Sequence, residues 1–211
     1  MKLTIFGATG RTGRQLTEQA MAAGHEVTAV VRDPARLAGL ATPRLHVVTA
    51  DVLDPAAIVP AVAGADAVVT AIGPRGNGPT TVSQDTARSI IQAMRKAGTQ
   101  RLLLVSGSVV TDEGEGPVMR HLLKPLVRRT ALRHVCADMR AAEAEVARSE
   151  LEWTIVRPPR LTDQPASGRY RTAIEANLPR GYTLSRADLA AYLLNLAGDP
   201  AATGQHLGIA N

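Results

Sequence analysis

A glycine-rich loop near the amino terminus constrains the fold of this chain more than any other feature. Gly7, Gly10 and Gly13 are spaced in the motif GATGRTG, between an apolar run that predicts a buried strand, Leu3–Phe6, and a helical pattern, Arg14–Ala23. Such a loop binds phosphate, because glycines let the backbone approach a pyrophosphate and the helix start offers free N–H groups. The spacing differs from the commoner G-x-G-x-x-G. A further strand follows at βαβ distance, so the loop predicts dinucleotide binding, with a purely structural turn as the weaker alternative.

Short apolar strands alternate with helical patterns along the whole chain. The predicted strands are Leu3–Phe6, Glu26–Val31, Leu45–Thr49, Ala67–Ala71, Arg101–Ser106 and Trp153–Val156. The predicted helices are Arg14–Ala23, Ala56–Ala63, Thr81–Ala97, Asp138–Ser149 and Ala187–Ala197. We therefore expect an α/β fold, a Rossmann-type doubly wound parallel sheet of order 3-2-1-4-5-6 with helices on both faces. A single domain should cover residues 1–211, with substrate-side insertions at about 107–133 and 161–184.

Composition narrows the classes of partner. Aromatic residues make up only 2% of the chain, which argues against single-stranded nucleic acid because stacking platforms are scarce. The formal net charge of +5 suits a multiply charged cofactor, although DNA or an anionic membrane would also be attracted. Cys136 is the only cysteine and the histidines are scattered, so we expect neither a disulfide nor a metal site. We expect a cytoplasmic protein without a membrane span, either a monomer or a weak homodimer.

Arg32, at the end of the second predicted strand, bears on the choice of coenzyme. An NAD site usually has Asp or Glu here, whereas an arginine pairs with the 2′-phosphate of NADP. Arg36 lies one helical turn further and can reach the same phosphate. We expect NADP(H) to be preferred, with NAD(H) still possible because Asp33 is adjacent. The alternative is that both arginines are solvated surface cations.

Ligands of doubly wound sheets bind beyond the carboxyl ends of the strands. The residues at these ends are Gly7, Arg32, Asp51, Ile72, Gly73, Ser106, Ser108, Pro158 and Arg160. Asp51 either accepts a hydrogen bond from the adenine amino group, with Val52 beside the ring, or caps the next helix. Asp54, just before a proline, is better placed for that cap.

Two further strand ends concern the reactive half of the coenzyme. A side chain at Gly73 would collide with a nicotinamide ribose, and Arg75 faces the pyrophosphate, an anionic substrate or solvent. Ser106 and Ser108 are candidate catalytic residues, because either hydroxyl can orient a substrate carbonyl or ring nitrogen. The alternative is that each serine only satisfies local backbone groups.

The tyrosines argue against a ketone reductase of the usual short-chain type. Such enzymes protonate the alkoxide with a Tyr-x-x-x-Lys pair, but Tyr170, Tyr182 and Tyr192 have no lysine four residues later. Hydride transfer to a flavin-like or extended conjugated acceptor needs this acid less, because the charge is delocalised and water can supply the proton. The sequence also lacks the G-x-S-x-G motif of a hydrolase nucleophile.

A basic stretch follows the fifth predicted strand. Its cations are Arg120, His121, Lys124, Arg128, Arg129 and Arg133. They interleave with Met119, Leu122, Leu123, Leu126 and Val127. We expect a flap that packs on the domain and keeps a solvated cationic face. An anionic substrate, a membrane surface or a partner protein is the alternative use of this segment.

Together these motifs resemble the atypical short-chain dehydrogenase/reductase superfamily, and within it the biliverdin-IXβ reductase/flavin reductase group and NmrA-like NAD(P)H-binding proteins. The resemblance covers almost the whole chain through GATGRTG, VVRDPARL, GPRGNGPTTV to ARSIIQAM, and VRPPRLTDQPASGRY. The resemblance implies a set of contacts for each part of the coenzyme. The pyrophosphate would contact Gly7, Thr9, Gly10, Arg11 and Thr12, and the 2′-phosphate would contact Arg32 and Arg36. The adenine would contact Asp51 and Val52, the middle of the coenzyme Gly73 and Arg75, and the nicotinamide Val105, Ser106, Arg160 and Leu161.

The chain also departs from that group. There the fifth strand ends in a Thr-Ser pair whose serine is considered functional, whereas this chain has Ser106-Gly107-Ser108. The coenzyme is expected to carry over, but the acceptor is not. We expect an NADPH-dependent oxidoreductase that transfers hydride to a flavin, a quinone or a similar conjugated acceptor. The alternatives are a non-catalytic NADP(H)-binding redox sensor, and an enzyme that reduces or isomerises a specific natural product.

Overall fold

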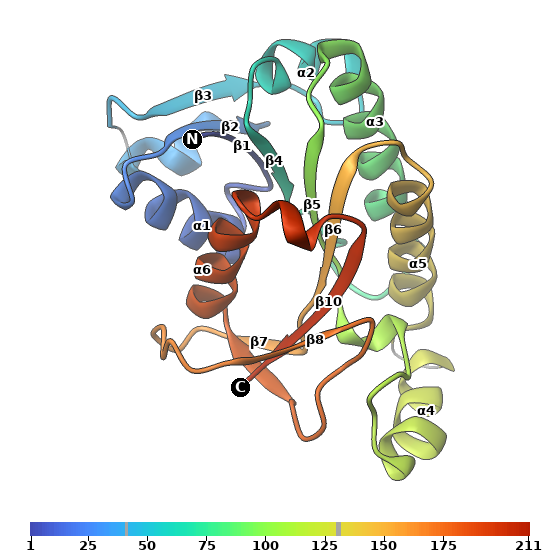
Figure 1. Ribbon diagram of the computed structural model, residues 1–211. Coiled ribbons are helices and arrows are strands. Elements are labelled where there is room, and N and C mark those ends of the chain that lie inside the picture. Colours follow the sequence, from blue (N-terminus) through green and yellow to red (C-terminus); the bar gives the residue numbers. More distant parts are fainter. Residues whose placement is uncertain (41, 130–131) are drawn as a thin grey trace.

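The computed structural model describes residues 1–40, 42–129 and 132–211, arranged around an eight-stranded sheet (Figure 1). Its strands are β1 (Lys2–Phe6), β2 (Glu26–Val31), β3 (Leu45–Thr49), β4 (Ala67–Thr70), β5 (Arg101–Val105), β6 (Glu152–Arg157), β8 (Arg171–Ile174) and β10 (Gln205–Ala210). They lie in the order β3-β2-β1-β4-β5-β6-β10-β8, and β8 alone runs antiparallel to its neighbour. The predicted order 3-2-1-4-5-6 is confirmed, and β10 and β8 extend the sheet beyond β6.

Helices cover both faces of this sheet, as predicted. One face carries α1 (Arg11–Ala22) and α6 (Arg186–Ala197), and the other carries α2 (Pro55–Val62), α3 (Val82–Ala97) and α5 (Arg133–Ala147). Figure 1 shows the two helical layers on opposite sides of the strands. The strands are apolar on both faces because both are covered: in β1, Ile5 packs toward α1 and α6, whereas Phe6 packs toward α2 and α3.

Some predicted boundaries and connections were wrong. The helix after the glycine loop begins at Arg11 rather than Arg14, and α5 begins at Arg133 rather than Asp138. Two strands, β7 (Arg160–Thr162) and β9 (Thr183–Ser185), pair in a small separate sheet. The remaining short elements are η1 (Pro34–Leu40), η2 (Ser108–Val110), η3 (Met119–Leu123), α4 (Lys124–Arg129) and η4 (Pro200–Ala202).

The segment after β5 does not have the burial that we predicted for a flap. It contains η2, η3 and α4, but Lys124 is buried while Leu122 and Leu126 are exposed. The cationic face is thus only partly solvated, and the apolar face is not packed on the domain at these two leucines. Residues 130–131 and the side chains at 119, 123, 127 and 128 lie outside the described part of the chain.

Candidate functional site

The loop between β1 and α1 is shaped by contacts that require glycine. Gly7 has φ +82°, and its carbonyl accepts a hydrogen bond of 2.9 Å from the N–H of Gly10. A Cβ at Gly13 would lie only 2.1 Å from the Gly7 oxygen, so the helix can approach the loop this closely only with glycine there. The first turn of α1 carries Arg11 and Arg14 instead of carboxylates. Its unpaired N–H groups and the positive end of the helix dipole therefore favour an anion.

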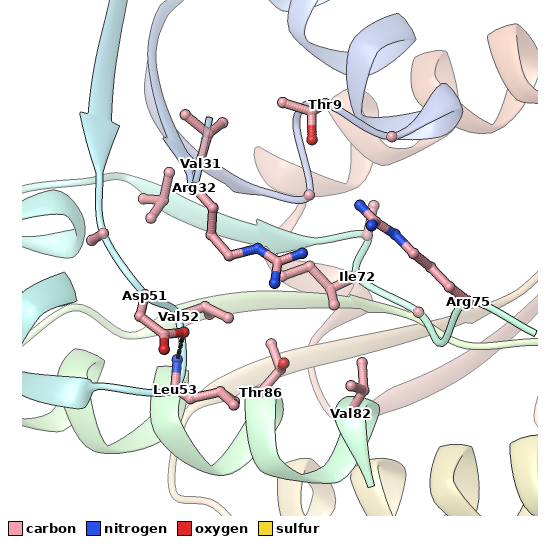
Figure 2. Close-up of a pocket in the computed structure, with 16 residues that line it drawn as sticks. Thr9, Val31, Arg32, Asp51, Val52, Leu53, Ile72, Arg75, Val82 and Thr86 are labelled. Carbon is pink, nitrogen blue, oxygen red and sulfur yellow. Dashed lines mark hydrogen bonds between the residues drawn. The ribbon is translucent and has the colours of Figure 1, made fainter. Parts of the chain in front are cut away.

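A cavity of about 450 Å³ opens beside this loop, at the carboxyl ends of β1 to β4. Figure 2 shows the side chains of Arg32 and Arg75 reaching into it from opposite sides. The predicted residues that line it are Gly7, Thr9, Gly10, Arg32, Asp51, Val52, Ile72, Gly73 and Arg75. The fold thus gathers onto one surface nine residues that lie on four separate strand ends in the sequence.

Residues beyond the prediction form the rest of the wall. They are Val30, Val31, Ala50, Leu53, Ala71, Val82 and Thr86. Val82 and Thr86 are four residues apart on α3, so they face the cavity together. Leu53 is 50% exposed although it is large and apolar, which suits a wall against which a flat ring can pack. The helical spacing of Val82 and Thr86 was a usable signal in the sequence.

Asp51 and Asp54, which follow β3, have different roles. Asp54 caps α2, because its carboxylate accepts from the N–H groups of Ala56 and Ala57 at 3.0 and 3.3 Å. Asp51 instead accepts from the N–H of Leu53 at 3.0 Å, within the cavity wall (Figure 2). The helix-cap alternative for Asp51 is therefore wrong, and its adenine contact stays a prediction.

Arg36 and Arg11 lie outside this cavity lining. The guanidinium of Arg36 donates to the Thr9 carbonyl at 3.3 Å, which holds it against the glycine loop. Arg11 pairs with Asp163 at 3.0 Å, and Arg186 pairs with the same carboxylate at 2.6 Å. These three side chains line a second cavity of about 320 Å³ between the starts of α1 and α6. Thr12 and Gly13 follow Arg11 in the first turn of α1 and line neither of these two cavities.

The predicted nicotinamide residues at the ends of β5 and β6 do not line the cavity of about 450 Å³. Ser106 is buried, its N–H donates to the Val156 carbonyl at 2.8 Å, and among the described residues none accepts from or donates to its hydroxyl. The N–H of Ser108 donates to the Pro158 carbonyl, also at 2.8 Å. A buried hydroxyl without a partner costs free energy, so Ser106 is the better of the two candidates for contact with a ligand. Val105 and Leu161 are half-buried in the adjacent core, while Arg160 is exposed on β7.

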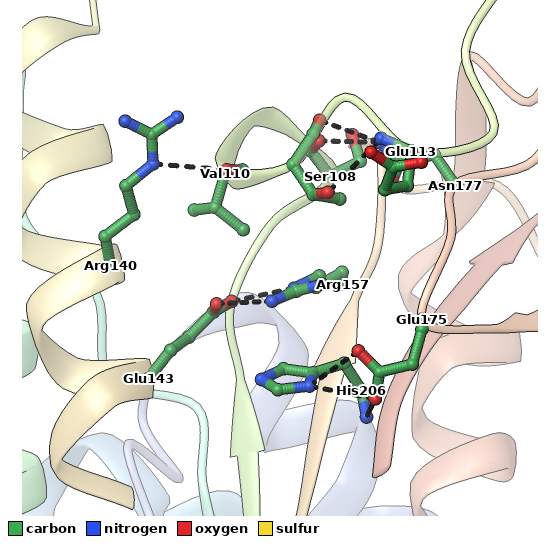
Figure 3. A network of polar contacts seen from close by, with 10 residues as sticks. Ser108, Val110, Glu113, Arg140, Glu143, Arg157, Glu175, Asn177 and His206 are labelled. Atoms are coloured by element: carbon green, nitrogen blue, oxygen red, sulfur yellow. Dashed lines mark hydrogen bonds and ion pairs between the residues drawn. The ribbon is translucent and has the colours of Figure 1, made fainter. Parts of the chain in front are cut away.

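A polar network holds the loop after β5 in place (Figure 3). The ammonium of the buried Lys124 donates to the carbonyls of Ser108 and Thr111, each at 2.8 Å, and forms an ion pair with Glu115. The amide of Asn177 donates to the same two carbonyls at 2.9 and 3.1 Å. Hydrogen bonds, some of them charge-assisted, therefore connect this loop to Lys124 further along the first predicted insertion and to Asn177 of the second.

A second part of the same network joins α5 to β6. Arg157 and Glu143 form two parallel hydrogen bonds of 3.0 and 2.7 Å, and both side chains are nearly buried. The guanidinium of Arg140 donates to the Val110 carbonyl at 3.1 Å. These contacts fix the positions of η2 and α5 relative to the end of β6.

The tyrosines pack away from the cavity. Tyr170 and Tyr192 contact each other edge to face, with ring centroids 5.5 Å apart, against the core of α1 and α6. Burial raises the pKa of Tyr192 to about 12. Tyr182 is 62% exposed. None of these phenols lines either of the two cavities described here.

Comparisons with known proteins agree with this geometry. The family described as NAD(P)H-binding matches residues 7–200. An uncharacterized chloroplastic protein of Arabidopsis thaliana is 32% identical over 190 aligned residues, and the match covers 85% of this chain and 66% of that protein. The chain therefore spans slightly less than two thirds of that relative's length. Among solved structures, a short-chain dehydrogenase/reductase of Veillonella parvula has a TM-score of 0.84 at 19% identity and covers 100% of this chain and 94% of its own.

ChuY of Escherichia coli O157:H7, an anaerobilin reductase, has a TM-score of 0.78 at 26% identity and covers 100% of this chain and 97% of its own.

Within residues 1–40, 42–129 and 132–211, no three His, Cys, Asp or Glu side chains are grouped as metal ligands would be. In the same ranges no helix is both long enough and apolar enough to cross a bilayer. The predicted resemblance to atypical short-chain dehydrogenases/reductases is confirmed by the matching family and by these neighbours.

Proposed function

Because the chain belongs to the NAD(P)H-binding family, we propose that it is an NADPH-dependent reductase that transfers hydride to a flavin, a quinone or a similar conjugated acceptor. The observation that carries this proposal is the cavity of about 450 Å³ that joins the glycine loop to Arg32. A main-chain anion site and a cation at the end of β2 suit a pyrophosphate and a 2′-phosphate, respectively.

The cavity residues fit the nucleotide half of the coenzyme. The missing side chains at Gly7 and Gly10 let the loop pack closely on itself and on Ala71 at the start of α1, where the first-turn N–H groups can bind the pyrophosphate. Arg32 is exposed and points into the cavity (Figure 2), so its guanidinium can bind the 2′-phosphate in a bidentate manner. Arg36, already tied to Thr9, is the second cation for this phosphate. NADP(H) is therefore the proposed coenzyme, with NAD(H) as the weaker one.

The reactive half would lie toward β4, β5 and β6. A Cβ built at Gly73 meets no described heavy atom within 4 Å, which leaves open space for a ribose. Arg75 faces this space, and Val105, Ser106, Pro158 and Leu161 lie further along the strand ends. When bound there, a nicotinamide coenzyme supplies the hydride. The chain contributes orientation, an apolar surround and the hydroxyl of Ser106.

The choice of acceptor rests on the proton donors. The phenol of Tyr192 is held protonated by a pKa of about 12, and its ring is packed against Tyr170. A conjugated acceptor spreads the charge it receives and can take its proton from water. The 26% identity to ChuY supports a reductase over other oxidoreductase types. We propose the cytoplasm as the compartment and a monomer or weak homodimer as the state; with Cys136 as its one cysteine, the sequence forms no intramolecular disulfide, which suits reducing surroundings.

The test is an acceptor panel. Purified protein is mixed with NADPH and FMN, riboflavin or a soluble quinone, and the nicotinamide absorbance is followed. Turnover supports the reductase. Tight NADPH binding by calorimetry, without turnover for any acceptor, would instead favour an NADP(H)-binding redox sensor, and absence of NADPH binding would refute both.

The two serines provide a matched pair for the catalytic assignment. With the acceptor that turns over fastest, Ser106→Ala should lower kcat about tenfold or more while NADPH affinity stays within about twofold, because the lost hydroxyl orients the reacting groups. Ser108→Ala should change kcat less, since the contacts of residue 108 that hold the loop involve its backbone. A larger effect at Ser108 would reverse the assignment.

A further inference from the structure

The segment from Val118 to Arg129, comprising η3, α4 and the residue before them, stands away from the body of the molecule. In Figure 1 α4 projects beyond the lower end of α5, away from the central sheet. Its base is attached to the domain by Lys124, whose ammonium binds the carbonyls of Ser108 and Thr111. The segment therefore projects from the domain near the carboxyl end of β5, and Lys124 holds its base in place.

The burial of this segment is the reverse of an ordinary surface helix. Its lysine, Lys124, is only 7% exposed, whereas Val118, Leu122 and Leu126 are 63%, 64% and 58% exposed. These three aliphatic residues are four positions apart in a continuous helical stretch, so they lie along one face. Because all three side chains are more than half exposed, they form a projecting ridge and do not line a pocket. Exposing such a row in water is costly unless another surface covers it.

The charges around this ridge are mostly positive, although Glu113 and Glu115 lie at its base. Between Glu115 and Asp138 the sequence contains lysines and arginines but no aspartate or glutamate. Arg120, His121 and Arg129 are exposed beside the leucines, and Arg120 meets its acidic neighbour Glu113 only at 3.9 Å. Aliphatic residues flanked mainly by cations are complementary to a surface that is negative outside and apolar beneath.

We propose that the ridge formed by Val118, Leu122 and Leu126, together with Arg120 and Arg129, binds the surface of an anionic lipid membrane. The leucines would enter the boundary between headgroups and acyl chains, while the arginines pair with lipid phosphates. A second copy of this chain is a poorer occupant, because two such surfaces would bring like charges together. The cytoplasmic face of a membrane carries the required negative potential. Binding does not depend on the proposed reductase activity.

The experiment is vesicle flotation with the full-length protein, using vesicles of equimolar phosphatidylglycerol and phosphatidylcholine and vesicles of phosphatidylcholine alone. The wild-type protein should float with the anionic vesicles at low salt, and far less with neutral vesicles or at high salt. The double variant L122N/L126N should bind about tenfold more weakly or worse, because the apolar contribution is lost. R120Q/R129Q should weaken binding to the anionic vesicles only.

Ile174→Asn is the matched control, since Ile174 is a comparably exposed aliphatic residue, at 62%, on β8. It should float like the wild type, and all variants should keep the wild-type melting temperature and NADPH affinity. The proposal is overturned if the protein ignores anionic vesicles, or if L122N/L126N binds them as well as Ile174→Asn does. It is also overturned if sedimentation shows that the leucines instead form a dimer, or if the ridge binds an acidic protein but no vesicle.

Discussion

Gly13 shows how a single missing side chain can position a helix. The Cβ of any other residue would meet the Gly7 carbonyl at 2.1 Å and the Ala8 Cα at 2.9 Å. Because these are backbone atoms, no rotamer change can relieve the contact. The start of α1 is therefore held against the loop, and its N–H groups are directed at the cavity.

Replacement of Gly13 by alanine should destabilise the protein. Helix propensity alone would favour alanine by about 1 kcal/mol, but the overlap with backbone should cost more, giving a net loss of about 1–3 kcal/mol. Chemical denaturation measures this loss. Gly73→Ala is the matched control, because open space surrounds that position; it should unfold like the wild type while binding NADPH more weakly. An unchanged or higher stability for Gly13→Ala would contradict the close contact.

Arg32 should decide between the two coenzymes. Arg32→Glu should weaken NADPH about 10–100-fold more than NADH, since a charge-assisted pair contributes about 1.5–3 kcal/mol and only NADPH has the 2′-phosphate. Calorimetric titration with both coenzymes gives the ratio. Arg95→Glu, on the far part of α3, makes the same charge change away from the cavity and should leave the ratio unaltered. Equal losses for NADPH and NADH would refute the assignment.

At the scale of elements, buried carboxylates join segments that are distant in the sequence. Asp138 of α5 accepts from the N–H groups of Ser83 and Gln84, both at 2.9 Å, and so caps α3 from another helix. Asp188 of α6 accepts from the N–H groups of Ser167 and Gly168 and from the Ser185 hydroxyl. The long connection between β7 and β8 is thereby anchored to α6. These contacts fix the ends of helices and strands that the local residue propensities alone do not define.

The Asp188 anchor makes stability depend on pH. Burial raises the pKa of its carboxyl, but the hydrogen bonds from Gly168, Ser185 and Ser167 outweigh this and lower the pKa overall. A lowered folded-state pKa stabilises the fold above the unfolded value of about 4, and this contribution is lost as the pH falls. Asp188→Asn should lose about 1–3 kcal/mol at neutral pH.

Denaturation at a series of pH values tests the sign. The difference between Asp188→Asn and the wild type should shrink as the pH is lowered through the range in which the carboxyl is protonated. Asp163→Asn provides the comparison, because Asp163 is 63% exposed and exposed ion pairs contribute little. A gap that stays constant down to acid pH would mean that the charge of Asp188 does not matter.

At the scale of the whole molecule, the coenzyme should act as a structural ligand. The proposed site takes residues from β2, from α3 and from the loops after β1, β3 and β4, so a ligand there would bridge five parts of the fold. NADPH at about one hundred times its Kd should stabilise the protein by about 2.7 kcal/mol, seen as a higher melting temperature. The net charge of +5 predicts that high salt reduces this gain. A melting temperature independent of NADPH would refute the proposed site.

The sequence alone determined the central architecture and the nucleotide side of the site. Strand runs, helical periods and the glycine spacing are local patterns, and the order 3-2-1-4-5-6 follows from them because parallel strands need right-handed crossovers. The same rule brings Gly7, Arg32, Asp51 and Gly73 to one edge, where the cavity lies. The late strands β8 and β10 were missed because their short stretches lack a clear alternation.

Only the tertiary structure decided which partner each side chain meets. Arg11 pairs with Asp163, 152 residues away, and Lys124 turns inward while Leu122 and Leu126 face out. Val82 and Thr86 form a cavity wall only because α3 packs against the sheet face that also buries Val68 of β4. Such choices depend on burial and hydrogen-bond satisfaction between segments distant in the chain, which no local pattern of residues encodes.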